Sequence, residues 1–332
     1  MAKPENMVEV WRGAFIESIH AGHAVICDAG GDIVRSWGDP DTVILPRSAC
    51  KMIQALPLVE SGAADAARLT IEHLALAFAS HQGAAVHTGR VRRWLSGLGL
   101  GEADLRCGPH PPYDTATRDS LIRAGEAPDQ VHNNCSGKHA GFLTLTRHLR
   151  AGPEYVDPEH PVQRAVREAF EDVTGAASPG YAVDGCSAPN FATTVHALAR
   201  AMAFFAAADD GTTRGRAARR LVSAMTAHPD LVAGEGRAGT ELSRAMNGRV
   251  ALKTGGEAMF TAIVPEKKLG VAVKIADGAG RASECAIGSI LVGLGVLDAD
   301  HPATMRRRNA PILNCRNMVT GYIRPAEGVF SA

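Results

Sequence analysis

Strand-like segments at the two ends of this chain enclose a helix-rich middle, and this order restricts the folds open to it. Between residues 8 and 37, apolar runs on either side of the turn Asp28–Gly31 predict an N-terminal antiparallel hairpin. Short β-like runs return at residues 249–254, 259–264 and 270–275. Since both ends supply strands, we predict an α+β fold, in which an antiparallel sheet built from both chain ends stands beside an inserted all-helical part.

The middle of the chain has apolar residues at helical spacing, interrupted by Gly, Pro and Asp clusters. One helix is predicted to begin after Pro46, with a kink at Pro57. Others are predicted at residues 71–79, 86–98, 118–124, 138–149, 161–173, 191–207, 217–225 and 282–296, and an edge strand at 318–323. The chain, 1–332, is thus predicted to be a single unit, with its sheet part at about 1–45 and 249–332 and its helical part at about 46–248.

Charge and composition favour a small-molecule partner. The 35 basic and 35 acidic residues cancel, and no long run of one sign occurs, so neither nucleic acid nor an anionic membrane surface is indicated as a partner. Residues 1–9 lack the apolar core of a signal peptide, and we therefore expect a cytoplasmic protein. The seven scattered cysteines are then expected to be free thiols, most of them buried.

Ser48 and Lys51 follow Pro46 at a predicted helix start, where a spacing of three puts both side chains on one face. A serine hydroxyl beside an amine is an activated nucleophile, because a deprotonated amine can accept the proton of the serine. Taken alone the spacing is weak evidence, since serine is also a common helix N-cap. A second motif is needed to decide between the two interpretations.

Lys253-Thr254-Gly255 supplies that motif at the edge of a predicted strand. Serine β-lactamases and penicillin-binding enzymes combine the two motifs in this order and context. In such a site Ser48 attacks a carbonyl, and the backbone N–H groups of Ser48 and of the residue after Gly255 can form an oxyanion hole. The chain lacks a Ser-Asp-Asn motif between the two and lacks an export signal, so we expect a cytosolic amide as the substrate.

The motifs together resemble those of the rhizobial-type (class 3) L-asparaginases, also called asparaginase II, whose fold is similar to that of serine β-lactamases and glutaminases. The resemblance rests on Pro46-Arg47-Ser48-x-x-Lys51, Ala79-Ser80-His81, Asn133 to Gly141, Val183-Asp184-Gly185-Cys186 and Lys253 to Glu257. It implies hydrolysis of the side-chain amide of L-asparagine to L-aspartate and ammonia. It also implies a homodimer and no organic cofactor.

The resemblance further implies the catalytic residues. Ser48 is the expected nucleophile, with Lys51 as its base. Ser80 and Lys253 are expected to form a second Ser-Lys pair in the same site. Without the resemblance, Ser80 would be interpreted as a polar residue at the end of an apolar helix.

A Zn2+ ion held by Cys135, Lys138 and Cys186 is also implied. Lysine is an unusual zinc ligand, and from spacing alone two core cysteines would be the better interpretation. Arg47 is expected to pair either with a substrate carboxylate or with a structural acid such as Asp184. The residues implied in substrate binding or its support are Arg47, Asp184, Thr254, Gly255 and His139.

Three alternatives to an asparaginase stay open at this point. They are a glutaminase, a β-lactamase-like hydrolase of another amide or ester, and a penicillin-binding-like sensor that does not turn over. Sustained product release separates an enzyme from the sensor. Assays with asparagine, glutamine and a chromogenic β-lactam separate the enzymes from one another.

Overall fold

The computed structural model describes residues 3–209 and 211–331. The chain divides into two compact units, each assembled from separate segments. Unit 1 contains Met1–Ala49, Thr193–Ala207 and Gly236–Ala332, and unit 2 contains Cys50–Ala192 and Ala208–Glu235. Residues 1, 2, 210 and 332 of the predicted sheet and helical parts lie outside the described residues. That the chain acts as a single unit stays a prediction.

Unit 1 is built on an antiparallel sheet of strand order β11-β12-β1-β2-β10-β9-β8, with β3 also paired to β2. β2 pairs with β10, where Val25 lies opposite Ala272, so strands from the two chain ends meet within the sheet. The α+β fold with an antiparallel sheet built from both chain ends is therefore confirmed. The strands are β1 (Glu5–Arg12), β2 (Phe15–Cys27), β3 (Ile33–Trp37), β8 (Ala251–Thr254), β9 (Met259–Val264), β10 (Leu269–Ile275), β11 (Ala310–Leu313) and β12 (Val319–Pro325).

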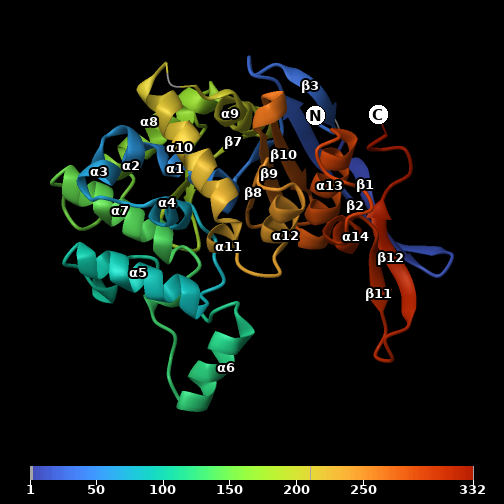
Figure 1. Ribbon diagram of the computed structural model, residues 1–332. Helices are drawn as coiled ribbons and strands as arrows, with labels where there is room; N and C mark the ends of the chain where they lie inside the picture. The colour runs from blue at the N-terminus through green and yellow to red at the C-terminus, as the bar shows by residue number, and fades with distance from the viewer. Residues whose placement is uncertain (1–2, 210, 332) are drawn as a thin grey trace. The chain divides into compact units, whose positions relative to one another are not determined.

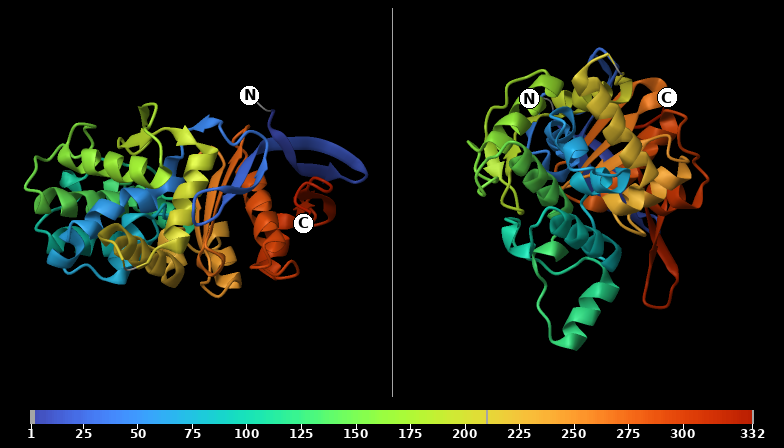
Figure 2. Two further views of the ribbon diagram at one scale, coloured as in Figure 1. Left: turned by 90° about the horizontal axis from the view of Figure 1, so that it is seen from above. Right: turned by 60° about the vertical axis from the view of Figure 1, so that its left-hand side comes forward.

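Helices cover both faces of this sheet (Figures 1 and 2). The side chains of Val271, Val273 and Ile275 alternate along β10 and share a core with α12 (Ala238–Ala245) and α13 (Gly280–Gly293). The opposite face of β10 carries α9 (Val195–Ala207). The short α14 (Pro302–Arg308) packs on α12 and α13, and a two-stranded ladder joins β4 (Val43–Ile44) to β7 (Thr193–Thr194).

Unit 2 is organised around α7 (Ser136–His148), whose residues 136–146 are all buried. Helix α4 approaches α7 closely, because a side chain at Gly137 would lie 2.5 Å from the carbonyl oxygen of Leu76. By contrast α6 has no buried residue and projects from the rest of unit 2 (Figure 1). The other helices are α1 (Lys51–Gln54), α2 (Leu56–Glu60), α3 (Ala63–Ala66), α4 (Ile71–Ala77), α5 (Ala85–Gly97), α6 (Thr115–Ala124), α8 (Pro161–Thr174), α10 (Thr213–Ala227) and α11 (Pro229–Val232).

The prediction of an all-helical middle is wrong at one place. A hairpin of β5 (Tyr181–Val183) and β6 (Pro189–Phe191) interrupts the helices, and β7 follows it. The helix predicted from residue 191 begins at Val195 instead, because Thr194 accepts a hydrogen bond from the N–H of Ala197 through its side chain. Two consecutive β-branched threonines favour a strand just before that cap.

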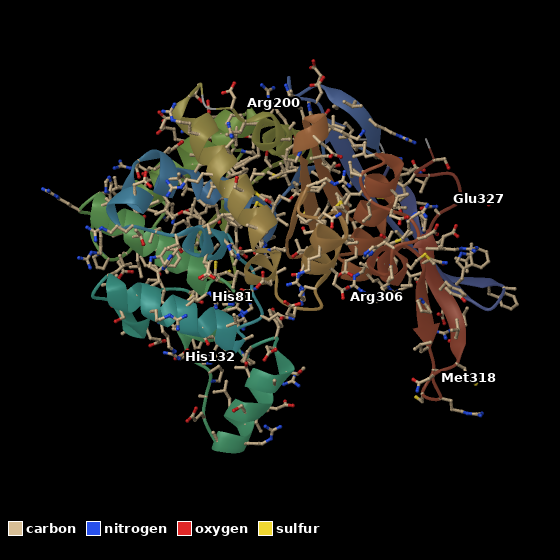
Figure 3. All side chains as sticks on the ribbon, in the orientation of Figure 1. His81, His132, Arg200, Arg306, Met318 and Glu327 are labelled. Carbon is tan, nitrogen blue, oxygen red and sulfur yellow. The ribbon has the colours of Figure 1, made fainter. Side chains whose placement is uncertain are left out.

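The predicted edge strand at 318–323 is also corrected. It forms β12, which lies between β1 and β11, so the outer strand is β11. Strand β11 was not predicted from the sequence, because Pro311 is one of its four residues and proline disfavours strand interiors. Met318 lies at the turn end of this hairpin (Figure 3). Among the described helices, none is long and apolar enough to cross a bilayer.

Candidate active site

Ser48 lies in a single 3-10 turn, η1 (Arg47–Cys50), and is half-buried. The turn begins with Arg47 at a φ of 53°, a left-handed conformation that costs free energy for a residue with a side chain. The N–H of Ala49 donates to the carbonyl oxygen of Pro46 at 3.0 Å and closes the turn. Helix α1 starts directly afterwards at Lys51, so Ser48 stands at a helix start as predicted.

The end of β8 packs against this turn within unit 1. A side chain at Gly255 would lie 2.8 Å from the carbonyl oxygen of Pro46 and 2.9 Å from the nitrogen of Ala49. Only glycine therefore permits this approach. One at Gly256 would lie 3.2 Å from the guanidinium carbon of Arg47. Residues 48 and 253 are 205 positions apart (253 − 48), yet their segments are neighbours.

A buried threonine of β9 joins the same two segments. The Thr261 hydroxyl donates to the carbonyl oxygen of Ala49 at 3.2 Å and to that of Lys253 at 3.3 Å. Lys253 itself is 2% exposed, and its amine donates to the carbonyl oxygen of Thr254 at 2.9 Å. The serine turn and the Lys-Thr-Gly strand are thus bonded through one shared hydroxyl.

Unit 2 holds Lys51 and Ser80. The Lys51 side chain is 1% exposed, and its amine donates to the carbonyl oxygen of Ala79 at 2.6 Å and to the Ser80 hydroxyl at 3.0 Å. It also lies 3.0 Å from the sulfur of Cys135. The pair of Ser80 with Lys253 that the resemblance implies stays a prediction, and the hydrogen bond that the structure gives is the one between Ser80 and Lys51.

His81, which is labelled in Figure 3, directly follows Ser80 and fixes its segment through hydrogen bonds at both ring nitrogens. Its Nδ1 accepts from the N–H of Gly83, so its Nε2 is the protonated nitrogen and donates to the Ser136 hydroxyl at 3.0 Å. Ser136 donates in turn to the carbonyl oxygen of Val131. Burial holds the pKa of His81 well below its usual value, which keeps the imidazole neutral and this bonding intact.

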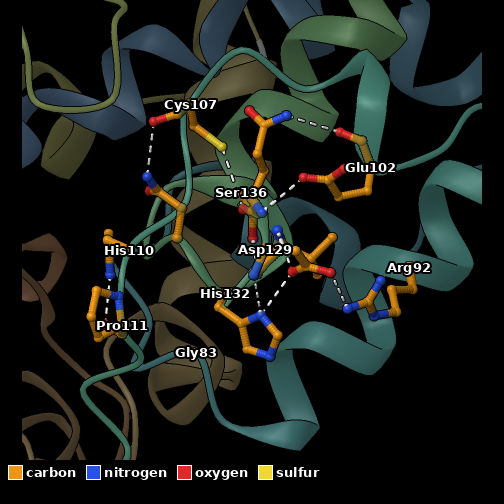
Figure 4. Close-up of polar contacts among 12 residues, drawn as sticks. Gly83, Arg92, Glu102, Cys107, His110, Pro111, Asp129, His132 and Ser136 are labelled. Atoms are coloured by element: carbon orange, nitrogen blue, oxygen red, sulfur yellow. Dashed lines mark hydrogen bonds and ion pairs between the residues drawn. The ribbon is translucent and has the colours of Figure 1, made fainter. Parts of the chain in front are cut away.

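Side-chain hydrogen bonds hold the loop before α7 in place (Figure 4). Asn133 donates to the carbonyl oxygens of Cys107 and Gly108 and accepts from the N–H of Cys135 at 2.8 Å. Asp129 binds His132 and accepts from Arg92. This bonding places Cys135 at the N-terminus of α7, beside Lys51.

Cys135, Lys138 and Cys186 come together in unit 2. Their side chains are 4%, 2% and 3% exposed, and the Lys138 amine lies 3.0 Å from the Cys186 sulfur. A hydrogen bond from Cys135 holds the pKa of Cys186 well below its usual range, with further lowering from Lys138 and His139. The same bond, together with burial, raises the pKa of Cys135. Of the two thiols, Cys186 is thus the one that its neighbours favour in the charged form.

Residues 8–325 match the family of L-asparaginase II. The chain belongs to the L-asparaginase II family. This is a family of amidohydrolases, and the matched residues include every predicted motif, from Pro46 to Glu257. A search of curated proteins gave no match.

Solved structures that are similar to this member of the L-asparaginase II family share little of its sequence. Mglu in its glutamate form is 17% identical, with a TM-score of 0.49, over 84% of this chain and 62% of that one. For native Mglu the values are 16%, 0.47, 84% and 66%. A β-lactamase from Mycobacterium bovis is 16% identical, with a TM-score of 0.47, over 83% of this chain and 95% of that one. The chain thus spans less than two thirds of the length of these Mglu structures.

The donors of the L-asparaginase II chain fit a zinc ion chemically. Two sulfurs and one amine meet in a buried place, the pKa of Cys186 is lowered by its neighbours, and cysteine sulfur is a preferred zinc ligand. In the part of the chain that the structure describes, no group of three or more His, Cys, Asp or Glu side chains is arranged to hold a metal. The lysine is therefore required to complete the set, and it must lose its proton to bind. The zinc ion stays a prediction.

Asp184 and His139 flank these donors in the L-asparaginase II chain. Asp184 lies with Cys186 in the loop between β5 and β6, where its carboxylate accepts from the N–H of Gly185 at 2.8 Å. The Nδ1 of His139 bonds the hydroxyl of Tyr155 at 2.9 Å, and burial lowers the pKa of His139. Asp184 and His139 are thus brought into unit 2 beside the predicted zinc ligands.

Two contributors were missed in the sequence. Tyr155, which holds His139, is fully buried and carries no motif of its own. Thr261 does leave a signal, because it is the one polar residue in the run Met-Phe-Thr-Ala-Ile-Val. A buried hydroxyl needs a partner, so such an exception marks a place to look.

The cysteines of the L-asparaginase II chain are free thiols and most are buried, as predicted. All seven are free, and Cys315 is the exposed one. Burial raises the pKa of Cys27, Cys107 and Cys285 to about 12, so these three remain protonated thiols.

Proposed function

We propose that the protein is an L-asparaginase that hydrolyses the side-chain amide of L-asparagine through an acyl-enzyme on Ser48. The observation that carries this proposal is the serine turn: Ser48 is half-buried, follows a residue in a strained conformation, and packs against the Lys-Thr-Gly end of β8. Strained turns of this kind concentrate at reacting groups. Membership of the L-asparaginase II family supports the choice of an amide.

In the first step the Ser48 hydroxyl oxygen attacks the side-chain carbonyl carbon of asparagine. The hydroxyl proton passes to the deprotonated amine of Lys51, which lies three residues further along a continuous helical stretch. The negative charge that forms on the carbonyl oxygen is stabilised by the N–H groups of Ser48 and Gly256. The C–N bond then breaks, and the leaving nitrogen takes the proton from Lys51 and departs as ammonia, which leaves Lys51 neutral again.

A water molecule completes the cycle by attacking the ester carbon while one of its protons passes to the Lys51 amine. The bond between this carbon and the Ser48 oxygen then breaks, Ser48 takes the proton from Lys51, and the released carboxylic acid loses its own proton to solvent to give aspartate. Ser80 supports the proton transfers, since its hydroxyl accepts a hydrogen bond from the Lys51 amine at 3.0 Å. Such a contact lets a proton move between the lysine and the site through a second hydroxyl. Lys253 adds positive charge at the end of β8.

Substrate recognition is assigned to charged groups of the same motifs. Asp184 would hold the α-amino group, and Arg47 offers a planar guanidinium to either a substrate carboxylate or a structural acid. Cys135, Lys138 and Cys186 would hold zinc. When bound, the ion supplies positive charge that can orient the amino or carboxylate group of the substrate.

Ammonia release from asparagine and glutamine, measured in parallel, tests the substrate. Ser48→Ala tests the nucleophile, and Lys51→Met is expected to lower kcat by about 10²- to 10⁴-fold, the usual contribution of a general base. Lys267→Met is the control, because that lysine is exposed. Near-normal ammonia release by Ser48→Ala would show the mechanism to be wrong. The homodimer that the resemblance implies is tested by sedimentation velocity.

A further inference from the structure

β9 contains one polar residue in an otherwise apolar strand. Its sequence is Met-Phe-Thr-Ala-Ile-Val, and all six residues are buried. Valine has nearly the shape of threonine, favours strands as well and needs no hydrogen-bond partner. Burial and strand propensity alone therefore favour valine over threonine at Thr261, and its hydroxyl calls for a separate reason.

The Thr261 hydroxyl connects the two segments of the proposed site that lie in unit 1. Thr261 stands opposite Lys253 in the ladder of β8 and β9. Its one proton is shared between the carbonyl oxygens of Ala49 and Lys253, at 3.2 and 3.3 Å. Thr261 is 0% exposed, so neither carbonyl can exchange this bond for one to water at that point.

The shared bond controls a spacing that the chemistry needs. Ala49 directly follows Ser48, and Lys253 lies three residues before Gly256. These are the two residues whose N–H groups are proposed to bind the oxyanion. Gly255 lets the two backbones touch, but contact alone does not fix how one slides past the other. A directional hydrogen bond from one hydroxyl to each backbone segment does fix their relative position.

We propose that Thr261 is a positioning residue of the Ser48 site, whose hydroxyl sets the spacing between the serine turn and the end of β8. The inference rests on the proposed role of Ser48. Because the spacing matters to the charged tetrahedral state more than to the bound substrate, losing the hydroxyl lowers kcat more than it raises KM.

The experiment compares Thr261→Val, which removes the hydroxyl, with Thr261→Ser, which keeps it. Thr304→Val is the matched control, because Thr304 is also 0% exposed in unit 1 and its hydroxyl has no hydrogen-bond partner among the described residues. Each variant is assayed for kcat and KM with L-asparagine and for its unfolding midpoint. The rate at which phenylmethylsulfonyl fluoride labels Ser48 is followed by mass spectrometry at several pH values.

Thr261→Val is expected to lower kcat and the labelling rate by about 10- to 100-fold with KM little changed, since misplacement by about 1 Å has effects of that order. Thr261→Ser is expected to restore most of both rates, and Thr304→Val to leave them unchanged. A wild-type labelling rate in Thr261→Val, or an equal loss in Thr261→Ser, overturns the inference. If Thr261→Val does not fold, Thr261→Cys is compared with Thr261→Ser, and equal rates then overturn it.

Labelling keeps this inference separate from the proposed substrate. If the wild-type protein releases no ammonia from asparagine but is labelled at Ser48, the substrate is wrong, and the labelling rates still decide the role of Thr261. If Ser48→Ala is labelled as fast as the wild-type protein, the nucleophile is wrong, and the inference falls with it.

Discussion

Gly255 is the residue at which the end of β8 touches the serine turn, and its lack of a side chain permits the contact. A methyl group there would lie 2.8 Å from the carbonyl oxygen of Pro46 and 2.9 Å from the nitrogen of Ala49. Both neighbours are backbone atoms, so the turn itself must move to make room. We predict that Gly255→Ala lowers kcat/KM by about 10- to 100-fold, since the turn carries the nucleophile.

Gly288→Ala is the control for this prediction. Gly288 lies inside α13 of the same unit, and a side chain there would meet nothing within 4 Å. Activity should be unchanged, and the free energy of unfolding should rise by about 0.5 to 1 kcal/mol. Steady-state kinetics and urea unfolding on the two variants check both statements. Full activity in Gly255→Ala would contradict the packing argument.

The buried side chain of His87 leads to a prediction about the stability of the fold at acidic pH. Its imidazole stacks on His81 at 4.8 Å and bonds the carbonyl oxygen of Asp230, and burial lowers its pKa. Below about pH 6.5 the unfolded chain takes up a proton that the folded chain does not, so the free energy of unfolding falls as the pH falls. The loss approaches about 1.4 kcal/mol per pH unit for each such histidine.

His87→Gln should show a shallower loss, because one of the groups responsible is gone. Urea unfolding of both proteins at pH 7.5 and pH 5.5 measures the difference. The exposed His148→Gln serves as a control and should keep the wild-type slope. Equal slopes in the wild-type protein and His87→Gln would count against the argument.

Among the elements, α9 depends on the absence of a side chain in β10. A methyl group on Gly270 would lie 2.0 Å from the nitrogen of Ala203 and 2.3 Å from the carbonyl oxygen of Ala199, both in the backbone of α9. We therefore predict that Gly270→Ala lowers the free energy of unfolding by about 3 kcal/mol, at the upper end for overpacking. Urea unfolding measures it, and a change below that for an ordinary surface substitution would refute the tight contact.

The elements also show why prediction from sequence succeeded in some places and failed in others. Strands β9 and β10 were predicted closely, because continuous apolar runs stand on either side of a Pro and Gly turn. β11 was missed, since its pairing with β12 comes from the sheet and is opposed by Pro311. Local pattern therefore identified the elements whose signals are local and missed the one formed by its neighbours.

The same difference between local signals and tertiary packing decides which parts of the site could be predicted. Ser48 and Lys253 were predicted from motifs, which record the chemistry of a site directly. The bond between Lys51 and Ser80 could not be predicted, because residues 29 positions apart meet only through tertiary packing. Thr261 stands out as the polar residue of an apolar run, but the two partners of its hydroxyl could not be predicted, because they too meet it only through tertiary packing.

For the molecule as a whole, the chain passes from unit 1 to unit 2 between Ala49 and Cys50. Ser48 and Lys51 therefore belong to different units and are joined by two residues of backbone. Within unit 1, Thr261 and Gly255 hold the serine turn, and within unit 2, Ala79 and Ser80 bind Lys51.

A bound metal would stabilise the whole folded chain, because it binds the folded protein and not the separated ligands. If Cys135, Lys138 and Cys186 hold zinc, protein purified without added metal should contain about one zinc per chain by elemental analysis. Removing it with a chelator should lower Tm by about 10 °C, if the ion was present at roughly 1,000 times its Kd.

Two buried cysteines make the zinc prediction specific. Cys186→Ala removes a proposed ligand and should carry no zinc and show no chelator-dependent change in Tm. Cys285→Ala removes an equally buried thiol from α13, far along the chain in unit 1, and should keep both the zinc and the change. Any loss of packing is common to the two variants, so only the metal distinguishes them. If Cys186→Ala keeps zinc at the wild-type level, then Cys135, Lys138 and Cys186 do not hold the ion. The two cysteines are then core thiols, as their spacing alone suggests.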